Sequence, residues 1–258
     1  MNPVNLLNLS LLFLLNLLFL PPLLVSPPPP QPVAPPQAAA TGRISGQVKL
    51  MGPHPGNPVI RMGVDPVCSR LNAGRRVVQD TVVTSADRGL ANAFVHLKGN
   101  IPSSRPPATP VVVDQRSCLY TPRVVGARVG QPLEVRNSDM ALHNVHSYSS
   151  GRNGFNVAQP LAGMSYRVEL KDEEILRLRC DLHRWMTAYV GVVNHPYFAV
   201  SGADGRFVVE NVPPGTYDIE SWHERYGTIT QTVRVRGGAA TTAAFGYTGK
   251  EPSPVSDR

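Results

Sequence analysis

The sequence predicts an all-β protein. Its 258 residues include 26 prolines and 22 glycines, which favour many turns over long helices. Several segments alternate apolar and polar residues with a period of two, as half-buried strands do, and no stretch longer than a turn or two shows helical periodicity. A chain of this length has room for more than one core, so we expect two β-sandwiches.

The N-terminal region predicts export. The first forty residues carry no Lys, Arg, Asp or Glu, and residues 6–20 are almost continuously apolar. We expect residues 1–25 to be a cleaved signal peptide or a retained anchor that tethers the protein, since about 20 apolar residues can span a bilayer. Residues 26–41 are Pro-rich and predict an extended linker. The protein is then periplasmic or extracellular, with or without a membrane tether.

The excess of Lys and Arg over Asp and Glu favours an acidic partner but does not require one. The formal net charge of +7 lies entirely on the exported part, because the first forty residues are uncharged. Such a surface attracts an acidic protein or an anionic membrane face, although charge needed for solubility explains it equally well. Basic runs interleaved with aromatic residues are absent from the sequence, which argues against a nucleic-acid partner.

Strands follow one another from about Gly42. Residues 43–50 and 90–99 alternate apolar and polar side chains, and a loop-rich stretch, residues 51–89, separates them. The middle of the chain repeats the pattern at residues 133–137, 166–170 and 176–180. After His195, a Gly-Ala-Asp-Gly turn and a Pro-Pro-Gly turn punctuate further strands. The pattern predicts a meander there.

A cluster of metal-ligating residues follows one of these strands. The segment "CDLHRWM" places Cys180, His183 and Met186 within seven residues, and His143 lies upstream in "RNSDMALHNVHS". Cys180 falls on the dry side of its strand with the leucines before it. One thiolate, two imidazoles and a weak axial thioether are the ligands of type 1 copper. A short loop can aim three of them at one point, so the sequence predicts one copper ion.

Simpler interpretations exist for each residue. A lone buried cysteine is usually an inert apolar group, and Met186 beside Trp185 would ordinarily belong to the core. Zinc is the competing metal, but a structural zinc site needs a fourth hard or thiolate ligand where this cluster offers a thioether. His146 lies three residues from His143, so on a strand the two rings face opposite sides, and we expect His146 to be structural.

These segments resemble a known family. The stretch "YTPRVVGARVGQPLEVRNSDMALHNVHS" followed by "CDLHRWM" is similar to the cupredoxins of the plastocyanin, amicyanin and pseudoazurin group, with loop spacing most similar to amicyanin. The resemblance implies a Greek-key β-sandwich whose copper ligands are His143, Cys180, His183 and the axial Met186. It also implies that Asn144 ties the ligand loops together. The sequence departs from the family at Asp181 and at the bulky pair Arg184-Trp185.

A second resemblance covers the flanking segments. "GADGRFVVENVPPGTYDIESW" is similar to the carboxypeptidase regulatory-like sandwich, a transthyretin-like fold whose opening strands match "ISGQVKL" and "LANAFVHLKG" far upstream. This predicts a cupredoxin domain, residues 105–194, inserted into a sandwich made of residues 42–104 and 195–248. Residues 249–258 would be a disordered tail.

Two cysteines remain once Cys180 is assigned to copper. Cys68 and Cys118 form an even pair in an exported chain, which favours a disulfide that pins the 51–89 loop to the start of the cupredoxin domain. Two free buried thiols are the alternative.

The function expected from this sequence is electron transfer. The resemblance implies a carrier that cycles between Cu(I) and Cu(II) rather than an enzyme, with a redox protein such as a cytochrome c as partner. We expect electrons to leave through the solvent-facing edge of His183 and the neighbouring Trp185. The alternative is a carbohydrate- or protein-binding sandwich in which copper is structural or is being handled, with Trp222 and Tyr226 as a stacking platform unless Trp222 belongs to the core.

Overall fold

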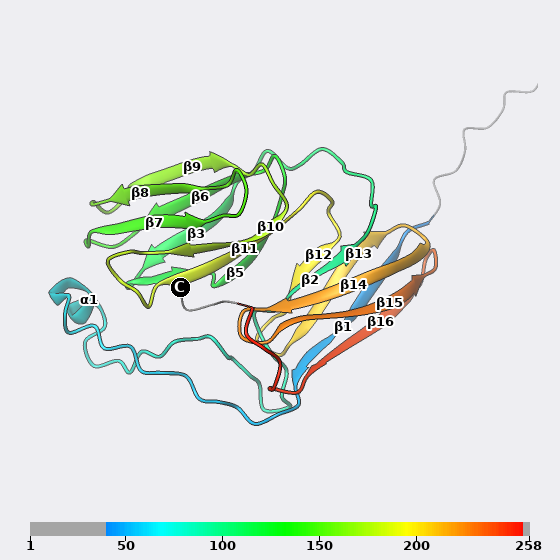
Figure 1. The fold of residues 1–258 in the computed structure, drawn as a ribbon, viewed down its shortest axis with the longest axis horizontal. Helices are drawn as coiled ribbons and strands as arrows, with labels where there is room; N and C mark the ends of the chain where they lie inside the picture. The colour runs from blue at the N-terminus through cyan, green and yellow to red at the C-terminus, as the bar shows by residue number, and fades with distance from the viewer. Residues whose placement is uncertain (1–39, 255–258) are drawn as a thin grey trace, which may run out of the picture. The chain divides into compact units, whose positions relative to one another are not determined.

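The all-β prediction is confirmed. A computed structural model describes residues 40–254, and their regular structure is sixteen strands and one short helix (Figure 1). The predicted export segment, nearly all of the predicted linker and residues 255–258 of the predicted tail lie outside the described residues. Within residues 40–254, no helix is long and apolar enough to cross a membrane.

The middle of the described chain forms one β-sandwich, here called the central sandwich. One sheet has the strand order β5-β11-β10-β7-β8, and the other has the order β4-β3-β6-β9. Its strands are β3 (Val111–Arg116), β4 (Leu119–Thr121), β5 (Val124–Arg128), β6 (Pro132–Asn137), β7 (His143–Tyr148), β8 (Phe155–Gln159), β9 (Ser165–Glu169), β10 (Glu174–Arg179) and β11 (Thr187–Val193). The pairs β3/β6 and β5/β11 are parallel, and the other neighbours are antiparallel.

The alternation of β10 decides which side chains enter the core of the central sandwich. Leu176 and Leu178 are fully buried against residues of both sheets. Arg177 and Arg179 are the intervening residues and project from the opposite face, because successive strand residues point to opposite sides. Cys180 follows β10 directly and is also fully buried, so the inward side of the strand leads to its thiol.

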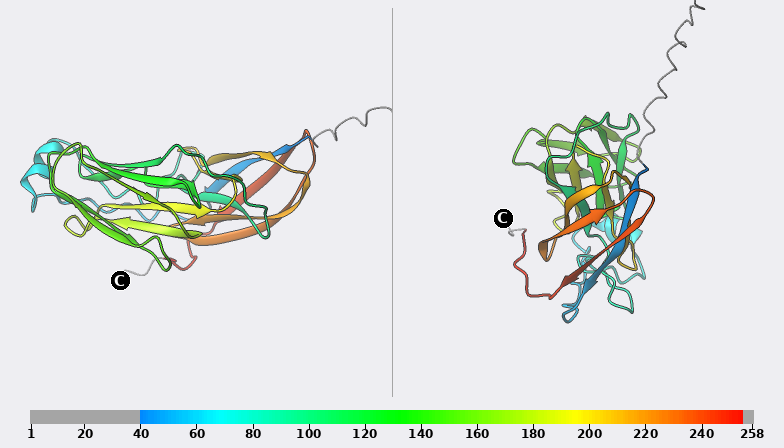
Figure 2. Two further views of the ribbon diagram at one scale, coloured as in Figure 1. Left: turned by 90° about the horizontal axis from the view of Figure 1, so that it is seen from above. Right: turned by 90° about the vertical axis from the view of Figure 1, so that its right-hand side faces the viewer.

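Strands from both ends of the described chain form a second sandwich, here called the split sandwich. Its sheets have the orders β13-β1-β16 and β12-β2-β14-β15 (Figures 1 and 2). Its strands are β1 (Gly42–Leu50), β2 (Phe94–Lys98), β12 (Phe198–Val200), β13 (Arg206–Val212), β14 (Gly215–His223), β15 (Gly227–Val235) and β16 (Ala240–Tyr247). One buried cluster joins Ile44 and Phe245 of the first sheet to Leu97 and Ile219 of the second.

The split sandwich is discontinuous in sequence. β1 pairs with β13 and β16, and β2 pairs with β12 and β14, so strands before residue 100 are hydrogen-bonded to strands after residue 195. An insertion of the central sandwich into a loop requires pairing of this kind. The domain limits and the likeness of the split sandwich to the carboxypeptidase regulatory-like family remain predictions.

Arg128, the last residue of β5, is hydrogen-bonded to both segments in which the chain passes between the sandwiches. Its guanidinium donates to the carbonyl oxygen of Ser104, to that of Arg105 at 2.9 Å and to that of Asn194 at 3.4 Å. Ser104 and Arg105 lie on the entering chain and Asn194 on the returning chain. One buried cation therefore ties both crossings together.

A small apolar cluster connects the two sandwiches. Phe94 of β2 packs where Gly126 and Gly191 pair across β5 and β11. A Cβ atom at Gly191 would lie 2.6 Å from the Phe94 ring, so only glycine allows this close approach. Tyr189 and Trp222 extend the contact with their ring centroids 5.1 Å apart.

The 51–89 loop carries the single helix of the described residues, α1 (Pro66–Leu71). Asp65 caps it by accepting hydrogen bonds from the backbone N–H groups of Val67 and Cys68, and Pro66 occupies the first turn, where its missing N–H costs nothing. Cys68 is joined by a disulfide to Cys118, between β3 and β4. This bond links the predicted pair and fastens α1 to the central sandwich.

The described part of the predicted tail, residues 249–254, has no helix or strand. The Glu251 carboxylate accepts hydrogen bonds from the backbone N–H groups of Thr248 and Gly249.

Candidate metal centre

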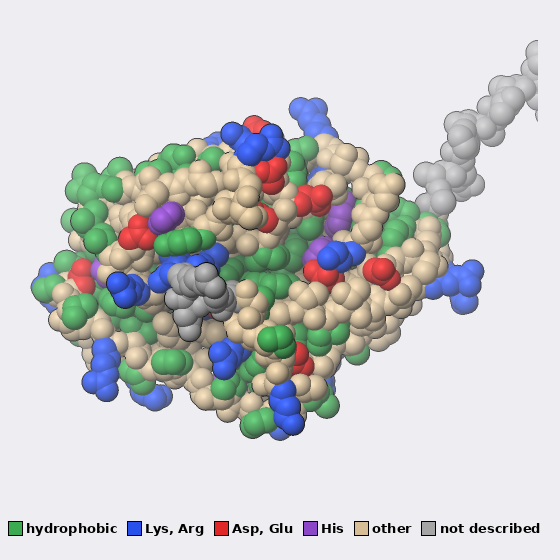
Figure 3. Space-filling model, viewed as in Figure 1, with side chains coloured by type: hydrophobic (Ala, Val, Ile, Leu, Met, Phe, Trp, Pro, Cys, Tyr) green, Lys and Arg blue, Asp and Glu red, His purple; other side chains and the backbone are tan. Residues whose placement is uncertain are grey.

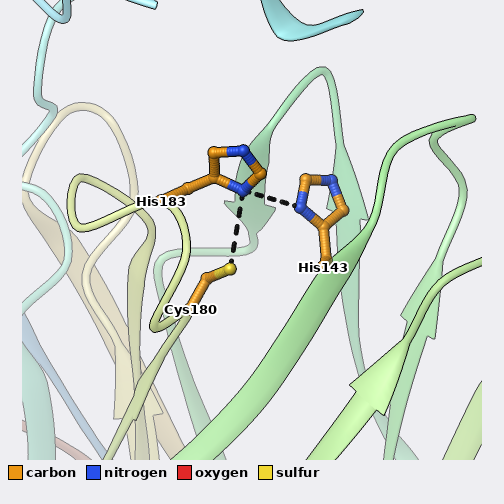
Figure 4. Close-up of side chains that lie close together, drawn as sticks. All are labelled: His143, Cys180 and His183. Atoms are coloured by element: carbon orange, nitrogen blue, oxygen red, sulfur yellow. Dashed lines mark hydrogen bonds between the residues drawn. The ribbon is translucent and has the colours of Figure 1, made fainter. Parts of the chain in front are cut away.

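Three side chains converge at one end of the central sandwich: His143, Cys180 and His183 (Figure 4). The two Nδ1 atoms are 3.0 Å apart, and the Cys180 Sγ lies 3.5 Å from the His183 Nδ1. His143 and Cys180 are fully buried, and His183 is 3% exposed. The sequence predicted these three residues as ligands, and the structure brings them together.

Local backbone structure explains the convergence. β10 and β11 are adjacent antiparallel strands, and residues 180–186 form the loop between them, here called the ligand loop. Two hydrogen bonds shape this loop: the Cys180 N–H donates to the Met186 carbonyl at 3.3 Å, and the Met186 N–H donates to the His183 carbonyl at 2.8 Å. His143 arrives from β7, which pairs with β10 on its other side.

Each imidazole is held from behind by a carboxylate. The His143 Nε2 lies 3.0 Å from the Asp139 Oδ2, and the His183 Nε2 lies 3.0 Å from the Asp65 Oδ2. Asp139 also accepts hydrogen bonds from the backbone N–H groups of Ser117 and Cys118. A carboxylate at Nε2 fixes the ring and its tautomer, so that Nδ1 faces the point where the three side chains meet.

The charges of the cluster favour a thiolate. Burial raises the pKa of Cys180, but hydrogen bonds to His143 and His183 outweigh burial and lower it to about 6. Burial lowers the pKa of His143, and the hydrogen bond to Asp139 together with the Cys180 sulfur raises it to about 9. The pKa of His183 is also raised, because hydrogen bonds to Cys180 and Asp65 outweigh its burial. The thiolate is the form of cysteine that binds metals.

Asn144 and Asp181 tie β7 to the ligand loop. The Asn144 Oδ1 accepts from the Asp181 backbone N–H at 2.6 Å, and its Nδ2 donates to the Asp181 carboxylate at 2.9 Å. The same carboxylate contacts the His146 Nδ1 at 3.1 Å. Asp181, which departs from the family pattern, is therefore the centre of this network. His146 pairs with it on the outer side, away from the three converging side chains.

Met186 is fully buried in the same core cluster as Cys180. Its backbone closes the ligand loop through the two hydrogen bonds described above. Its role as an axial ligand stays a prediction.

The expectation that the edge of His183 meets solvent is wrong. The Asp65 carboxylate and the Cys68 sulfur, 3.6 Å from the His183 Nε2, cover this edge. The segment that begins α1 therefore closes the site from outside. Trp185 is half-buried: its Nε1 donates to the Cys118 carbonyl at 2.9 Å, and its ring centroid lies 5.0 Å from that of His183.

Sequence reasoning missed Asp65 and Asp139. Asp65 stands before a proline, a recognisable helix cap, but nothing in the sequence places it 118 residues away beside His183. Asp139 precedes His143 by four residues, in the connection between β6 and β7. Two further groups of potential ligands, Asp65/Cys68/His183 and Cys118/Asp139/His143, depend on disulfide-bonded sulfurs and offer no thiolate.

The chemistry of the donor set fits copper. A cysteine sulfur and two imidazole nitrogens converge, and a buried thioether belongs to the same loop as Cys180 and His183. The carboxylates lie behind the imidazoles, at Nε2, where they orient the rings instead of completing a tetrahedral zinc site.

Comparison with known proteins gives partial likenesses. No family model and no curated protein matches the chain. A purple cupredoxin from Nitrosopumilus maritimus is 23% identical over 29% of this chain and 81% of its own, with a TM-score of 0.27. A copper-containing nitrite reductase from Thermus scotoductus SA-01 is 18% identical over 38% of this chain, with a TM-score of 0.29, and the chain spans 25% of it. A reduced amicyanin variant is 19% identical over 38% of this chain and 97% of its own, with a TM-score of 0.30.

Proposed function

We propose that this protein binds one copper ion and transfers electrons. His143, Cys180 and His183 would hold the ion in a trigonal set, with Met186 as the weak axial ligand. The observation that carries the proposal is the convergence of two Nδ1 atoms and one cysteine sulfur in a buried cluster. When bound, copper supplies a one-electron change between Cu(I) and Cu(II).

The protein's own residues suit outer-sphere electron transfer. Burial keeps water from the ligands, and the two carboxylates hold the imidazoles in fixed orientations. Two hydrogen bonds between Asn144 and Asp181, one accepted and one donated by the Asn144 side chain, hold the loop that begins at Cys180. A donor set fixed in this way changes little in shape between oxidation states.

The same features support a carrier rather than an enzyme. His183 is 3% exposed, and the start of α1 covers its outer edge, which leaves little room for a substrate to reach the ligands. Metal-dependent hydrolysis or oxidation needs an open position at the metal. We therefore propose no catalytic residue.

The carbohydrate-binding alternative loses its platform. Trp222 is 6% exposed and Tyr226 is 3% exposed, so neither ring offers a face on which a sugar could stack. Trp222 instead packs against Tyr189 in the cluster between the sandwiches.

The proposal includes an oxidising compartment and a redox partner. The Cys68–Cys118 disulfide supports export to the periplasm or the extracellular space, where such bonds persist. A protein such as a cytochrome c is the proposed partner. Because His183 is covered, electrons would leave by way of Trp185, whose half-buried ring lies beside it.

Visible and EPR spectra of the Cu(II)-loaded protein test this function. We expect an intense thiolate-to-copper charge-transfer band that Cys180→Ser abolishes. Met186→Leu should keep copper and raise the reduction potential, because loss of a weak donor disfavours Cu(II). His146→Ala is the matched control and should leave the spectrum unchanged. A pale Cu(II) protein with an ordinary tetragonal EPR signal would contradict the proposal.

A further inference from the structure

A cleft rich in arginine lies beside the ligand loop. Its volume is about 490 Å³, and side chains from β10, the ligand loop, the residue before β5 and the β14–β15 turn line it. Figure 3 shows some of the basic side chains of this face, in blue, near the ends of β10 and β11. The lining includes five arginines: Arg123, Arg177, Arg179, Arg184 and Arg225.

The structure holds two of these arginines in place. Arg177 and Arg179 are two residues apart on β10, so both project from the outer face of the sheet. Both guanidinium groups lie over the ring of Tyr148, at 4.8 and 5.7 Å from its centroid. Cation–π contacts of this kind restrict the motion of long side chains, so these two charges are arranged before any ligand arrives.

Three arginines of the cleft have no acidic partner among the described residues. Glu224 is the one carboxylate in the lining, and it already receives two hydrogen bonds from Arg123. Arg123 also contacts Asp80 at 3.1 Å. Arg179, Arg184 and Arg225 have no carboxylate within ion-pair distance in the part of the chain that the structure describes.

We propose that this cleft binds a small polyanion, a molecule with two or more phosphate or carboxylate groups. Guanidinium groups are always charged, and their planar forks match the oxygens of phosphate and carboxylate. Arg179, Arg184 and Arg225 stand on three different segments, so a ligand with several anionic groups can contact more than one of them. The inference does not depend on copper binding.

A ligand with a single negative charge should bind to the cleft weakly. Each charge-assisted hydrogen bond contributes about 1.5–3 kcal/mol, roughly tenfold or more in affinity. A monovalent anion engages one or two arginines, whereas pyrophosphate reaches across the cleft. We therefore expect pyrophosphate to bind at least about tenfold more tightly than acetate.

Calorimetric titration of the full chain without added copper, with inorganic pyrophosphate as the probe, tests the proposal. Copper is omitted because pyrophosphate itself chelates it. Arg179→Gln and Arg225→Gln should each weaken binding about tenfold, and the double variant should weaken it further. Arg234→Gln removes an exposed arginine outside the cleft and should bind like the parent.

Thermal unfolding of each variant separates lost binding from lost folding. The proposal holds if the Arg179 and Arg225 variants unfold like the parent and bind pyrophosphate more weakly. It is overturned if the parent does not bind pyrophosphate at millimolar concentration, or if both variants bind as tightly as the parent. Binding of a glutamate-rich peptide without binding of pyrophosphate would also overturn it, because the cleft would then recognise a protein segment.

Discussion

The two histidines of the candidate site have the same local arrangement but different origins. His143 is held by Asp139, four residues before it in the same sandwich, with a side chain 4% exposed. His183 is held by Asp65, which belongs to the 51–89 loop, 118 residues away, with a side chain 27% exposed. The central sandwich alone therefore builds one half of the site. The other half depends on a segment that precedes this sandwich in the chain.

The difference indicates where the site can loosen. Asp139 is fixed by two backbone N–H groups as well as by His143. Asp65 is fixed by its own helix cap and by the Cys68–Cys118 disulfide next to it. Loss of the disulfide should therefore affect the His183 half and leave the His143 half in place.

Removing the disulfide tests this comparison and should have the largest effect of the changes considered. Cys68→Ala with Cys118→Ala should lower the free energy of unfolding of the copper-free chain by about 4 kcal/mol, the loop-entropy value for residues 50 apart. Urea titration measures this change. Hydrogen exchange should become faster in α1, while the amides of β7 near His143 remain protected.

The Cys180→Ala variant keeps the disulfide and serves as the matched cysteine control for α1. If the α1 amides stay as protected in the double variant as in the parent, the disulfide is not what holds the Asp65 segment.

Substitutions of the two carboxylates form a matched pair of variants, and their expected effects are moderate. Asp139→Asn should lower the free energy of unfolding by about 3 kcal/mol, because an amide cannot accept from all the buried donors that Asp139 serves. Asp65→Asn should cost less than about 1 kcal/mol, since asparagine still caps a helix. Copper affinity should fall about 100-fold in the first variant and about tenfold in the second.

Urea unfolding and copper competition with a chelator measure both effects. Equal losses in the two variants would show that the local and the distant carboxylate contribute alike, against the comparison.

A third buried imidazole extends the comparison to the split sandwich. Burial, helped by the Arg123 charge, lowers the pKa of His223 from 6.5 to about 3, and its Nε2 has no hydrogen-bond partner among the described residues. His223 therefore takes up a proton below about pH 6.5 in the unfolded chain, but only below about pH 3 in the folded chain. Stability should fall by about 2 kcal/mol between pH 7.5 and 5 from this group.

His223→Asn should remove this acid sensitivity. The asparagine oxygen can replace the Nδ1 that accepts from the Arg225 backbone N–H at 3.1 Å. Free energies of unfolding measured across this pH range give the comparison, and an unchanged slope in the variant would assign the acid loss to other groups.

Local patterns in the sequence were sufficient for the strands and for Cys180 and His183, whereas His143 was expected at the site from its residue type and from the family resemblance. The alternation of residues 176–180 placed Cys180 on the buried side, and the spacing from Cys180 to His183 fitted one short loop. Both are contacts near in sequence or fixed by strand period. The same period placed His146 away from the site.

Local patterns could not predict that the Asp65 segment covers the edge of His183. Its edge was expected to be open because a loop histidine has nothing beside it in sequence. The Asp65 carboxylate reaches it only through the long 51–89 connection, whose path has no periodic signal. The arginine cleft was missed for a similar reason, because Arg225 and Arg179 belong to different sandwiches.

The Arg128 contacts have a mechanical consequence. A body joined to its neighbour by one chain can swivel about that chain. The central sandwich is joined by two chain crossings and by the Cys68–Cys118 disulfide of the 51–89 loop, and the guanidinium of Arg128 contacts Ser104, Arg105 and Asn194 where the two crossings meet. Such a junction resists torsion. A partner that grips one sandwich would therefore turn the other with it, and the orientation of the candidate site would be set by whatever holds the split sandwich.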